Sequence, residues 1–426
     1  MAELANFSAV DSLLNSFVSS QVFPGATAII ADRTGWLHTV AVGQTTYEKS
    51  SQAVSLHDTL FDLASLTKVT ATTTAAMLLY QWGVLKLSGN VTTLFGPAFA
   101  AVDHRKALMT VADLLTHSAG LPPDPTPVSF CTPQFACPET VAHRASERKL
   151  VFSCRSQALA AIIEQPLDRP PATKFVYSDI SMLALMFIVG HLARPFVSPN
   201  LLLSECMEAY DNRGHGVSGK ADIVSGVDQC YYEAFCRQYI FEPLLMRRNR
   251  SKSGVHRIGN QGRFTPFLGF TPPRNLWQRA APTWNDTWQG FPGECIQPYR
   301  DRVLQGEVSD GNAFALGGIA GHAGVFGSAP ELSQLLHQLL FAPSSSGTRK
   351  SGVLGINSTT AQLFTTVRNA SFSSRALGWD TNQPGGYLGC GNLSASTFTH
   401  TGCKTSMKFE RNALHHFMSH MRTTVL

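Results

Sequence analysis

Charged residues are scarce in this sequence. Only 15% of its 426 residues are Asp, Glu, Lys or Arg, against about a quarter in an average globular protein. The net charge of +5 comes from 34 basic and 29 acidic residues spread along the chain, so the composition does not indicate a nucleic-acid-binding protein. With 44% hydrophobic residues, the whole chain is neither disordered, nor a coiled coil, nor a collagen.

Membrane-spanning and secretory signals are also missing. The longest apolar run, residues 182–189, is far shorter than the roughly 18 residues that cross a bilayer, and it predicts a buried core helix. Residues 1–10 lack a basic segment followed by an apolar one, so no secretory signal is expected. We therefore expect a cytoplasmic protein with no membrane or nucleic-acid partner.

The 9 cysteines contain no C-x-x-C pair. The spacings Cys131/Cys137 and Cys230/Cys236 do not match zinc-site patterns, and an odd number of cysteines cannot all pair. Free thiols in a reducing compartment are the simplest interpretation. No metal and no cofactor is expected.

Two common hydrolase motifs are absent as well. There is no G-x-S-x-G, the nucleophile elbow of α/β-hydrolases, and no H-E-x-x-H, the zinc-protease motif. His415, His416 and His420 leave a metal-dependent hydrolase open as a third hypothesis, but a His-rich short helix over residues 412–421 is the simpler interpretation.

The hydrophobic pattern predicts strands at both ends of the chain around a helical, loop-rich middle. Helices are expected at residues 7–18, 66–87, 111–115, 178–192, 231–239 and 330–340, and a hairpin at 25–30 and 36–42. This order indicates one α+β unit over residues 1–426, with an antiparallel sheet flanked by helices. Residues 1–60 and 318–426 would form its α/β part. Residues 61–317 would form an inserted, mostly helical part, with an insertion near 194–230.

Ser65 and Lys68 are the candidate nucleophile and its neighbour. They lie three residues apart at the start of a predicted helix, so both side chains share one helix face. A serine hydroxyl needs a neighbouring base, and a lysine one turn away can act as that base or polarise another. An isolated S-x-x-K is more often a helix cap beside a surface lysine, and Ser146 with Lys149 matches the same pattern.

Two further motifs follow Ser65 in order. They are Tyr177-Ser178-Asp179, at the start of a predicted helix, and His400-Thr401-Gly402, in a strand-like run. The order S-x-x-K, Y-x-[ND], [KH]-x-G resembles the serine β-lactamase and penicillin-binding-protein family, and in particular its class C β-lactamase, esterase and D-aminopeptidase branch. The similarity covers roughly residues 7–409 and includes segments 23–26, 114–121, 241–244 and 318–326.

The resemblance implies a β-lactamase/transpeptidase-like fold with its site between the sheet and the helical part. It implies that Ser65 forms an acyl-enzyme and that Lys68 and Tyr177 form the proton-accepting network. Either could be the base, although a carboxylate at Asp179 would hold Lys68 as an ammonium and favour Tyr177. The backbone N–H groups of Ser65 and Cys403, the residue after Gly402, would hold the oxyanion.

Two positions in the motifs depart from the β-lactamase pattern. Asp179 replaces the usual Asn, and His400 replaces a lysine, so a substrate carboxylate would be anchored less strongly. His322 is expected either to line the site from its Gly-rich loop or to be part of the loop structure. An esterase- or peptidase-like serine hydrolase acting on a small ester, amide or lactam is therefore expected, rather than a true penicillinase.

The length of chain after the third motif supports an alternative. Family members usually continue with further strands and a long helix, whereas only residues 405–426 follow here, so a sheet that lacks an edge element is one expectation. With the insertion near 194–230, this keeps open a non-catalytic ligand-binding or scaffold member of the same fold. The oligomeric state is not predicted.

Overall fold

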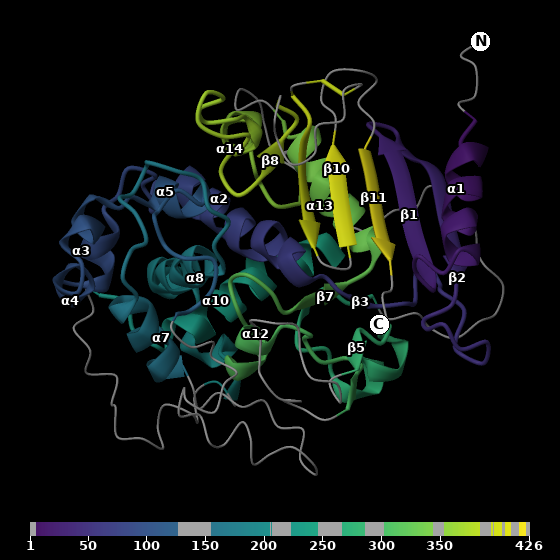
Figure 1. The fold of residues 1–426 in the computed structure, drawn as a ribbon, viewed down its shortest axis with the longest axis horizontal. Coiled ribbons are helices and arrows are strands. Elements are labelled where there is room, and N and C mark those ends of the chain that lie inside the picture. Colours follow the sequence, from purple (N-terminus) through teal and green to yellow (C-terminus); the bar gives the residue numbers. More distant parts are fainter. Residues whose placement is uncertain are drawn as a thin grey trace.

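A computed structural model describes residues 6–126, 155–204, 206, 223–245, 266–285, 302–343, 353–383, 393–394, 396–402, 405–409 and 417–422. Its largest sheet has six antiparallel strands in the order β2-β1-β11-β10-β9-β8. Strands from both ends of the sequence thus lie side by side (Figure 1). The strands are β1 (Gly25–Asp32), β2 (Gly35–Gly43), β8 (Asp380–Thr381), β9 (Phe398–Gly402), β10 (Thr405–Phe409) and β11 (Phe417–Arg422).

Strand β1 is buried on both faces, because a helix covers each side of it. On one face, Ala26 and Ala28 pack with Leu14 of α1 (Ser8–Ser19). On the other face, Ile29 joins the main core, and α13 (Ala329–Leu340) contacts β1 and β11. A capping box at Ser328 starts α13. The predicted α+β class, an antiparallel sheet flanked by helices, is confirmed.

The middle of the chain is mostly helical and lies beside this sheet (Figure 1). The remaining α-helices are α2 (Thr74–Gln81), α3 (Val91–Phe95), α4 (Ala98–Ala101), α5 (Val111–Leu115), α7 (Arg155–Glu164), α8 (Asp179–Ala193), α10 (Asp228–Cys236), α12 (Gly311–Ala315) and α14 (Ser358–Thr365). The 3₁₀-helices are Ala64–Leu66, His104–Leu108, Arg194–Phe196, Pro199–Leu201 and Arg274–Arg279, and π-helices cover Lys68–Thr73 and Arg237–Phe241. Two small antiparallel sheets join β3 (Phe61–Asp62), β7 (Val325–Gly327) and β4 (Gly269–Phe270), and β5 (Trp284–Asn285) with β6 (Val303–Leu304).

Helix α8 forms the centre of the helical part. By length and composition alone, the segment Asp179–Phe196 could cross a membrane, with a mean hydropathy of 1.3, but 67% of it is buried inside the structure. It contacts α2, α5, α7 and α10. This agrees with the prediction of a buried core helix at residues 182–189, because apolar residues on every side of a helix require packing on every side.

The helix predicted over residues 66–87 is divided into three parts. A 3₁₀ turn at Ala64–Leu66 leads into a π-helix at Lys68–Thr73 and then into α2, which ends at Gln81. The Thr74 hydroxyl donates to the Val69 carbonyl at 2.7 Å, five residues back. Because π-turns are uncommon and often occur at functional sites, this irregularity directly after Ser65 is informative.

One prediction about the C-terminal segment is wrong. The described residues 417–421 belong to β11 (Phe417–Arg422) and not to the predicted helix over 412–421. This strand pairs with β1 on one side and with β10 on the other, with Ala26 opposite Arg422 and Thr405 opposite Met421. Strand β11 therefore lies inside the sheet rather than at its edge, and the expectation of a missing edge element stays a prediction. Pairing with a strand almost 400 positions earlier, rather than local helix propensity, decides the structure here.

The prediction of free thiols is also wrong in part. Cys206 and Cys230 form a disulfide that links α10 to the segment before it, whereas Cys236 is free and buried. The 24-residue separation matches no local cysteine motif, so only the tertiary packing of α10 reveals the pair. Part of the predicted insertion near 194–230, residues 205 and 207–222, lies outside the described residues.

The contact between α8 and α10 leaves no room for a side chain at Gly190. A Cβ atom there would lie 1.8 Å from the Asp228 carbonyl oxygen. We expect Gly190→Ala to separate the two helices and to lower the free energy of unfolding by about 1–3 kcal/mol, measured by urea denaturation.

Gly269→Ala is the matched control for Gly190→Ala, because its Cβ would meet Phe267 at an ordinary 3.5 Å. Equal effects of the two substitutions on the denaturation midpoint would contradict the close helix contact.

Candidate active site

Ser65 lies in a tight turn between β3 and the π-helix. The turn is held by Asp62, whose carboxylate accepts hydrogen bonds from the Ala64 N–H at 2.9 Å and the Ser309 N–H at 2.7 Å. Ala64 adopts a φ of 45°, which is unfavourable for a residue with a Cβ. The backbone is thus constrained directly before Ser65, whose side chain remains partly exposed while its neighbours are buried.

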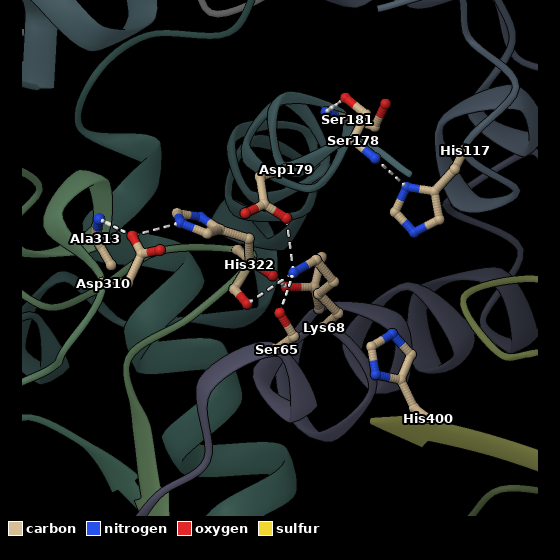
Figure 2. Close-up of polar contacts among 12 residues, drawn as sticks. Ser65, Lys68, His117, Ser178, Asp179, Ser181, Asp310, Ala313, His322 and His400 are labelled. Atoms are coloured by element: carbon tan, nitrogen blue, oxygen red, sulfur yellow. Dashed lines mark hydrogen bonds and ion pairs between the residues drawn. The ribbon is translucent and has the colours of Figure 1, made fainter. Parts of the chain in front are cut away.

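Lys68 is fully buried and binds three groups with its ammonium. Its Nζ donates to Ser65 Oγ at 2.8 Å and to the His322 carbonyl at 3.2 Å, and it lies 2.8 Å from Asp179 Oδ1 (Figure 2). The same Nζ is 4.8 Å from the centre of the Tyr177 ring. These contacts bring together five of the residues that the sequence predicted.

The charge state of Lys68 follows from these neighbours. Burial lowers the pKa of Lys68, but the charges and hydrogen bonds of Asp179 and Tyr177 outweigh it, so its pKa is raised above the ordinary value. Lys68 is therefore an ammonium at neutral pH. In this state it donates hydrogen bonds and cannot accept the proton of Ser65.

Tyr177 and Asp179 are placed by the start of α8. Ser178 caps this helix by accepting a hydrogen bond from the Ser181 N–H, and its hydroxyl donates to the Pro122 carbonyl at 2.7 Å. The Ser178 N–H in turn donates to His117 Nδ1 at 3.2 Å. The His117 ring packs on Tyr177, with ring centres 4.7 Å apart. The capping serine thus fixes the residues on either side of it.

His400 on β9 and His117 are both neutral. Burial, followed by the positive charges of Arg375 and Lys68, lowers the pKa of each well below its ordinary value. His400 Nδ1 bonds to the Thr401 carbonyl at 2.8 Å, and the Tyr177 and His400 ring centres are 6.2 Å apart. A neutral His400 gives no positive charge for a substrate carboxylate.

Buried His322 forms an ion pair with half-buried Asp310 on the other side of Lys68. Its Nε2 lies 2.8 Å from Asp310 Oδ1, which also accepts the Ala313 N–H at 2.7 Å as the cap of α12 (Figure 2). Burial lowers the pKa of His322, but the negative charges of Asp310 and Asp179 together raise it by more. The pKa of His322 is therefore above its ordinary value. His322 in turn holds the pKa of Asp310 below its usual range, despite the burial of that carboxyl.

The structure thus brings Ser65, Lys68, Tyr177, Asp179, His322 and His400 to one place. Gly402 ends β9 opposite Thr405, whereas Cys403 lies outside the described residues.

Sequence reasoning missed three residues near the site: His117, Asp310 and Arg375. Arg375 is buried, with its guanidinium 5.5 Å from the Tyr177 ring centre and 4.8 Å from that of Phe175. Of the three, only His117 lies in a segment that resembles the family in sequence. That resemblance gave His117 no role.

One group of side chains near the site could in principle hold a metal ion. Asp179, Asp310 and His322 each offer a donor atom, and these atoms lie within 4.8 Å of one another. Each carboxylate is already paired with a cation, Asp179 with Lys68 and Asp310 with His322, so the group is internally neutralised. Of the terminal histidines, His420 lies on β11, and positions 415 and 416 are outside the described residues.

Comparison with known proteins agrees with this geometry. The family model described as Beta-lactamase matches residues 10–196. A predicted D-alanyl-D-alanine carboxypeptidase of Escherichia coli (strain K12) is 26% identical over 332 residues, which cover 76% of this chain. The chain spans only 59% of that relative's length.

Solved structures show the same fold at low sequence identity. EstCE1, a hydrolase with promiscuous acyltransferase activity, superposes with a TM-score of 0.61 at 15% identity, covering 97% of this chain and 92% of its own. A class C β-lactamase superposes with a TM-score of 0.58 at 13% identity, covering 98% and 91%. The fold is therefore that of the β-lactamase/transpeptidase class.

The His322–Asp310 pair gives a prediction about pH. We expect Asp310→Asn to lower the pKa of His322, because the carboxylate is the main group that favours the imidazolium. Titration of the His322 ring by NMR measures this change. Asp11→Asn is the matched control, because Asp11 pairs with His38 at 2.7 Å on another part of the molecule.

The same pair should affect stability. Since the pKa of His322 is higher in the folded chain, its charge stabilises the fold fully below about pH 6.5, and this contribution is lost as the pH rises through the folded-state pKa. An unchanged His322 titration in Asp310→Asn would contradict the pairing.

Proposed function

We propose that this chain, which is related to the β-lactamases and penicillin-binding-protein homologues, is a serine hydrolase that forms an acyl-enzyme on Ser65. The observation that carries the proposal is the 2.8 Å hydrogen bond from the buried Lys68 ammonium to Ser65 Oγ. Because that hydrogen bond occupies a lone pair of Ser65, the hydroxyl proton is free to leave toward another group. This contact supports an activated nucleophile rather than a helix cap.

Tyr177 is the group that we assign as the base. The Lys68 ammonium lies over its ring at 4.8 Å and attracts the negative charge that a proton-accepting tyrosine oxygen carries. Asp179 supports this assignment by keeping Lys68 charged through the 2.8 Å ion pair. Lys68 then orients Ser65 and stabilises charge, while Tyr177 takes the proton.

The reaction has two halves. Ser65 Oγ attacks the substrate carbonyl as its proton passes to Tyr177, and the backbone N–H of Ser65 donates to the developing oxyanion. When the tetrahedral intermediate collapses, the leaving group takes the proton from Tyr177 and the acyl group remains on Ser65. Water then attacks the ester, gives its proton to Tyr177, and releases the acid as Ser65 regains its proton.

Small esters and amides are the substrates we propose. The named activities of the relatives support an acyl-transfer substrate, and one of them, an N-acetylmuramyl-L-alanine amidase of Bacillus subtilis (strain 168), is 27% identical over 397 residues, covering 89% of this chain and 73% of its own. A penicillin carries a carboxylate, and the neutral, buried His400 offers it little attraction. We therefore place lactams below esters as substrates.

Ser65→Ala should abolish ester hydrolysis. We expect kcat/KM for 4-nitrophenyl acetate to fall at least about 10³-fold, because removal of a nucleophile leaves only the residual rate from substrate binding and the oxyanion donors. Steady-state release of nitrophenol measures this fall.

Ser146→Ala is the control, since Ser146 belongs to the other S-x-x-K match in the sequence. Full activity in Ser65→Ala would contradict the proposed nucleophile, whereas a parent chain that binds the ester without hydrolysing it would favour a non-catalytic, ligand-binding role for the fold. Nitrocefin turnover by the parent as fast as ester turnover would contradict the substrate preference.

Tyr177→Phe tests the assignment of the base. We expect kcat to fall by about 10²–10⁴ with little change in KM, because only the proton-accepting oxygen is removed. Tyr47→Phe removes an exposed hydroxyl that donates to the Gln21 carbonyl at 3.0 Å, and it should leave kcat unchanged. A Tyr177→Phe variant with parental kcat would transfer the base role to another group.

A further inference from the structure

A proline-rich segment lies directly beside the candidate active site. Pro122, Pro123 and Pro125 surround a single acidic residue, Asp124. The Pro122 carbonyl accepts the Ser178 hydroxyl at 2.7 Å, and the Pro123 carbonyl accepts the Asp179 N–H at 2.7 Å. The segment is thus bonded to the same start of α8 that positions Tyr177 and Asp179.

The other side of the segment is held as well. Buried Gln165 accepts the Thr126 N–H at 2.9 Å and donates to the Thr126 hydroxyl at 2.8 Å. On the preceding side, a Cβ at Gly120 would lie 2.1 Å from the Arg169 carbonyl, so the backbone there is closely packed. With proline limiting the backbone on both sides, the backbone of Asp124 has a fixed position beside the start of α8.

Negative charges outnumber positive charges in the group of side chains around Asp124. Asp179, Asp310, His322 and Lys68 act electrostatically on its carboxyl, and a partial loss of solvent followed by the two acidic neighbours raises the pKa of Asp124. Asp179 is paired with Lys68 and Asp310 with His322, each at 2.8 Å. Within the described part of the chain, Asp124 is exposed and has no hydrogen bond or ion pair of its own. Three carboxylates therefore face two cations.

We propose that Asp124 determines substrate specificity by binding a primary ammonium group on the acyl part of the substrate, as in an amino-acid ester or the N-terminal residue of a peptide. A substrate ammonium supplies the third cation that the three carboxylates lack, whereas a carboxylate at the same place meets net negative charge. On the opposite side of Lys68, His400 and His117 are neutral and give no comparable preference. This inference rests on the proposed function for its substrate class.

Two methyl esters that differ in the charge on their α-nitrogen test the proposal. Alanine methyl ester carries an ammonium at pH 6.5, and N-acetylalanine methyl ester is neutral at the same position. We expect the parent to prefer the charged ester in kcat/KM. Asp124→Asn should reduce that preference about 3- to 10-fold, mainly through KM, and should leave the acetylated ester unchanged.

Asp168→Asn is the matched control for Asp124→Asn. Asp168 is a nearby exposed carboxylate whose N–H donates to the Gly120 carbonyl, and its Oδ2 lies 3.9 Å from Arg169. We expect it to keep the parental preference. Equal turnover of both esters by the parent would overturn the proposal, because it would show that the site does not select for charge. An equal loss for both esters in Asp124→Asn would also overturn it, because Asp124 would then have a merely structural role.

Equilibrium binding separates this proposal from the proposed function. In a Ser65→Ala background, calorimetry with the same two esters needs no turnover, and the Kd for alanine methyl ester should rise about 3- to 10-fold when Asp124→Asn is added. That rise would support Asp124 even if 4-nitrophenyl acetate is not hydrolysed by the parent. An unchanged Kd would contradict Asp124 even if Ser65 proves to be the nucleophile.

Discussion

The buried ion pair between Lys68 and Asp179 is the interaction on which the site depends. It joins the π-helix after β3 to the first residue of α8, two segments more than a hundred positions apart in the sequence. A buried ammonium without a partner would be strongly destabilising, so the pair requires α8 to begin where it does. The Ser178 cap and the proline carbonyls that bind Ser178 and Asp179 supply that constraint.

The rest of the fold supports this pair from three directions. The His322 carbonyl on the Gly-rich loop accepts a further hydrogen bond from Lys68, and β7, which follows that loop, pairs with β3 directly before Ser65. The close contact of α8 with α10 at Gly190 fixes the position of α8. The large sheet brings His400 on β9 to the Tyr177 ring. The site is consequently a product of the whole chain rather than of one motif.

The residues that carry the proposed chemistry were predictable because they belong to short motifs. Ser65 with Lys68, Tyr177 with Asp179, and His400 are each recognisable within three or four positions. Asp310 and Arg375 were not predictable, because only tertiary packing brings their charges to His322 and Tyr177. The same reason explains β11 and the Cys206–Cys230 disulfide, which depend on distant partners. Because of that disulfide, the cysteines no longer support a reducing compartment. The cytoplasmic location stays a prediction.

Acid-quenched mass spectrometry during turnover of 4-nitrophenyl acetate tests the central claim most directly. The account predicts one acetyl group per chain, located by peptide mapping on Ser65, because an ester intermediate at this hydroxyl is the chemistry that the Lys68 and Tyr177 contacts support. An acetyl group mapped to any other residue while the ester is being hydrolysed would contradict it.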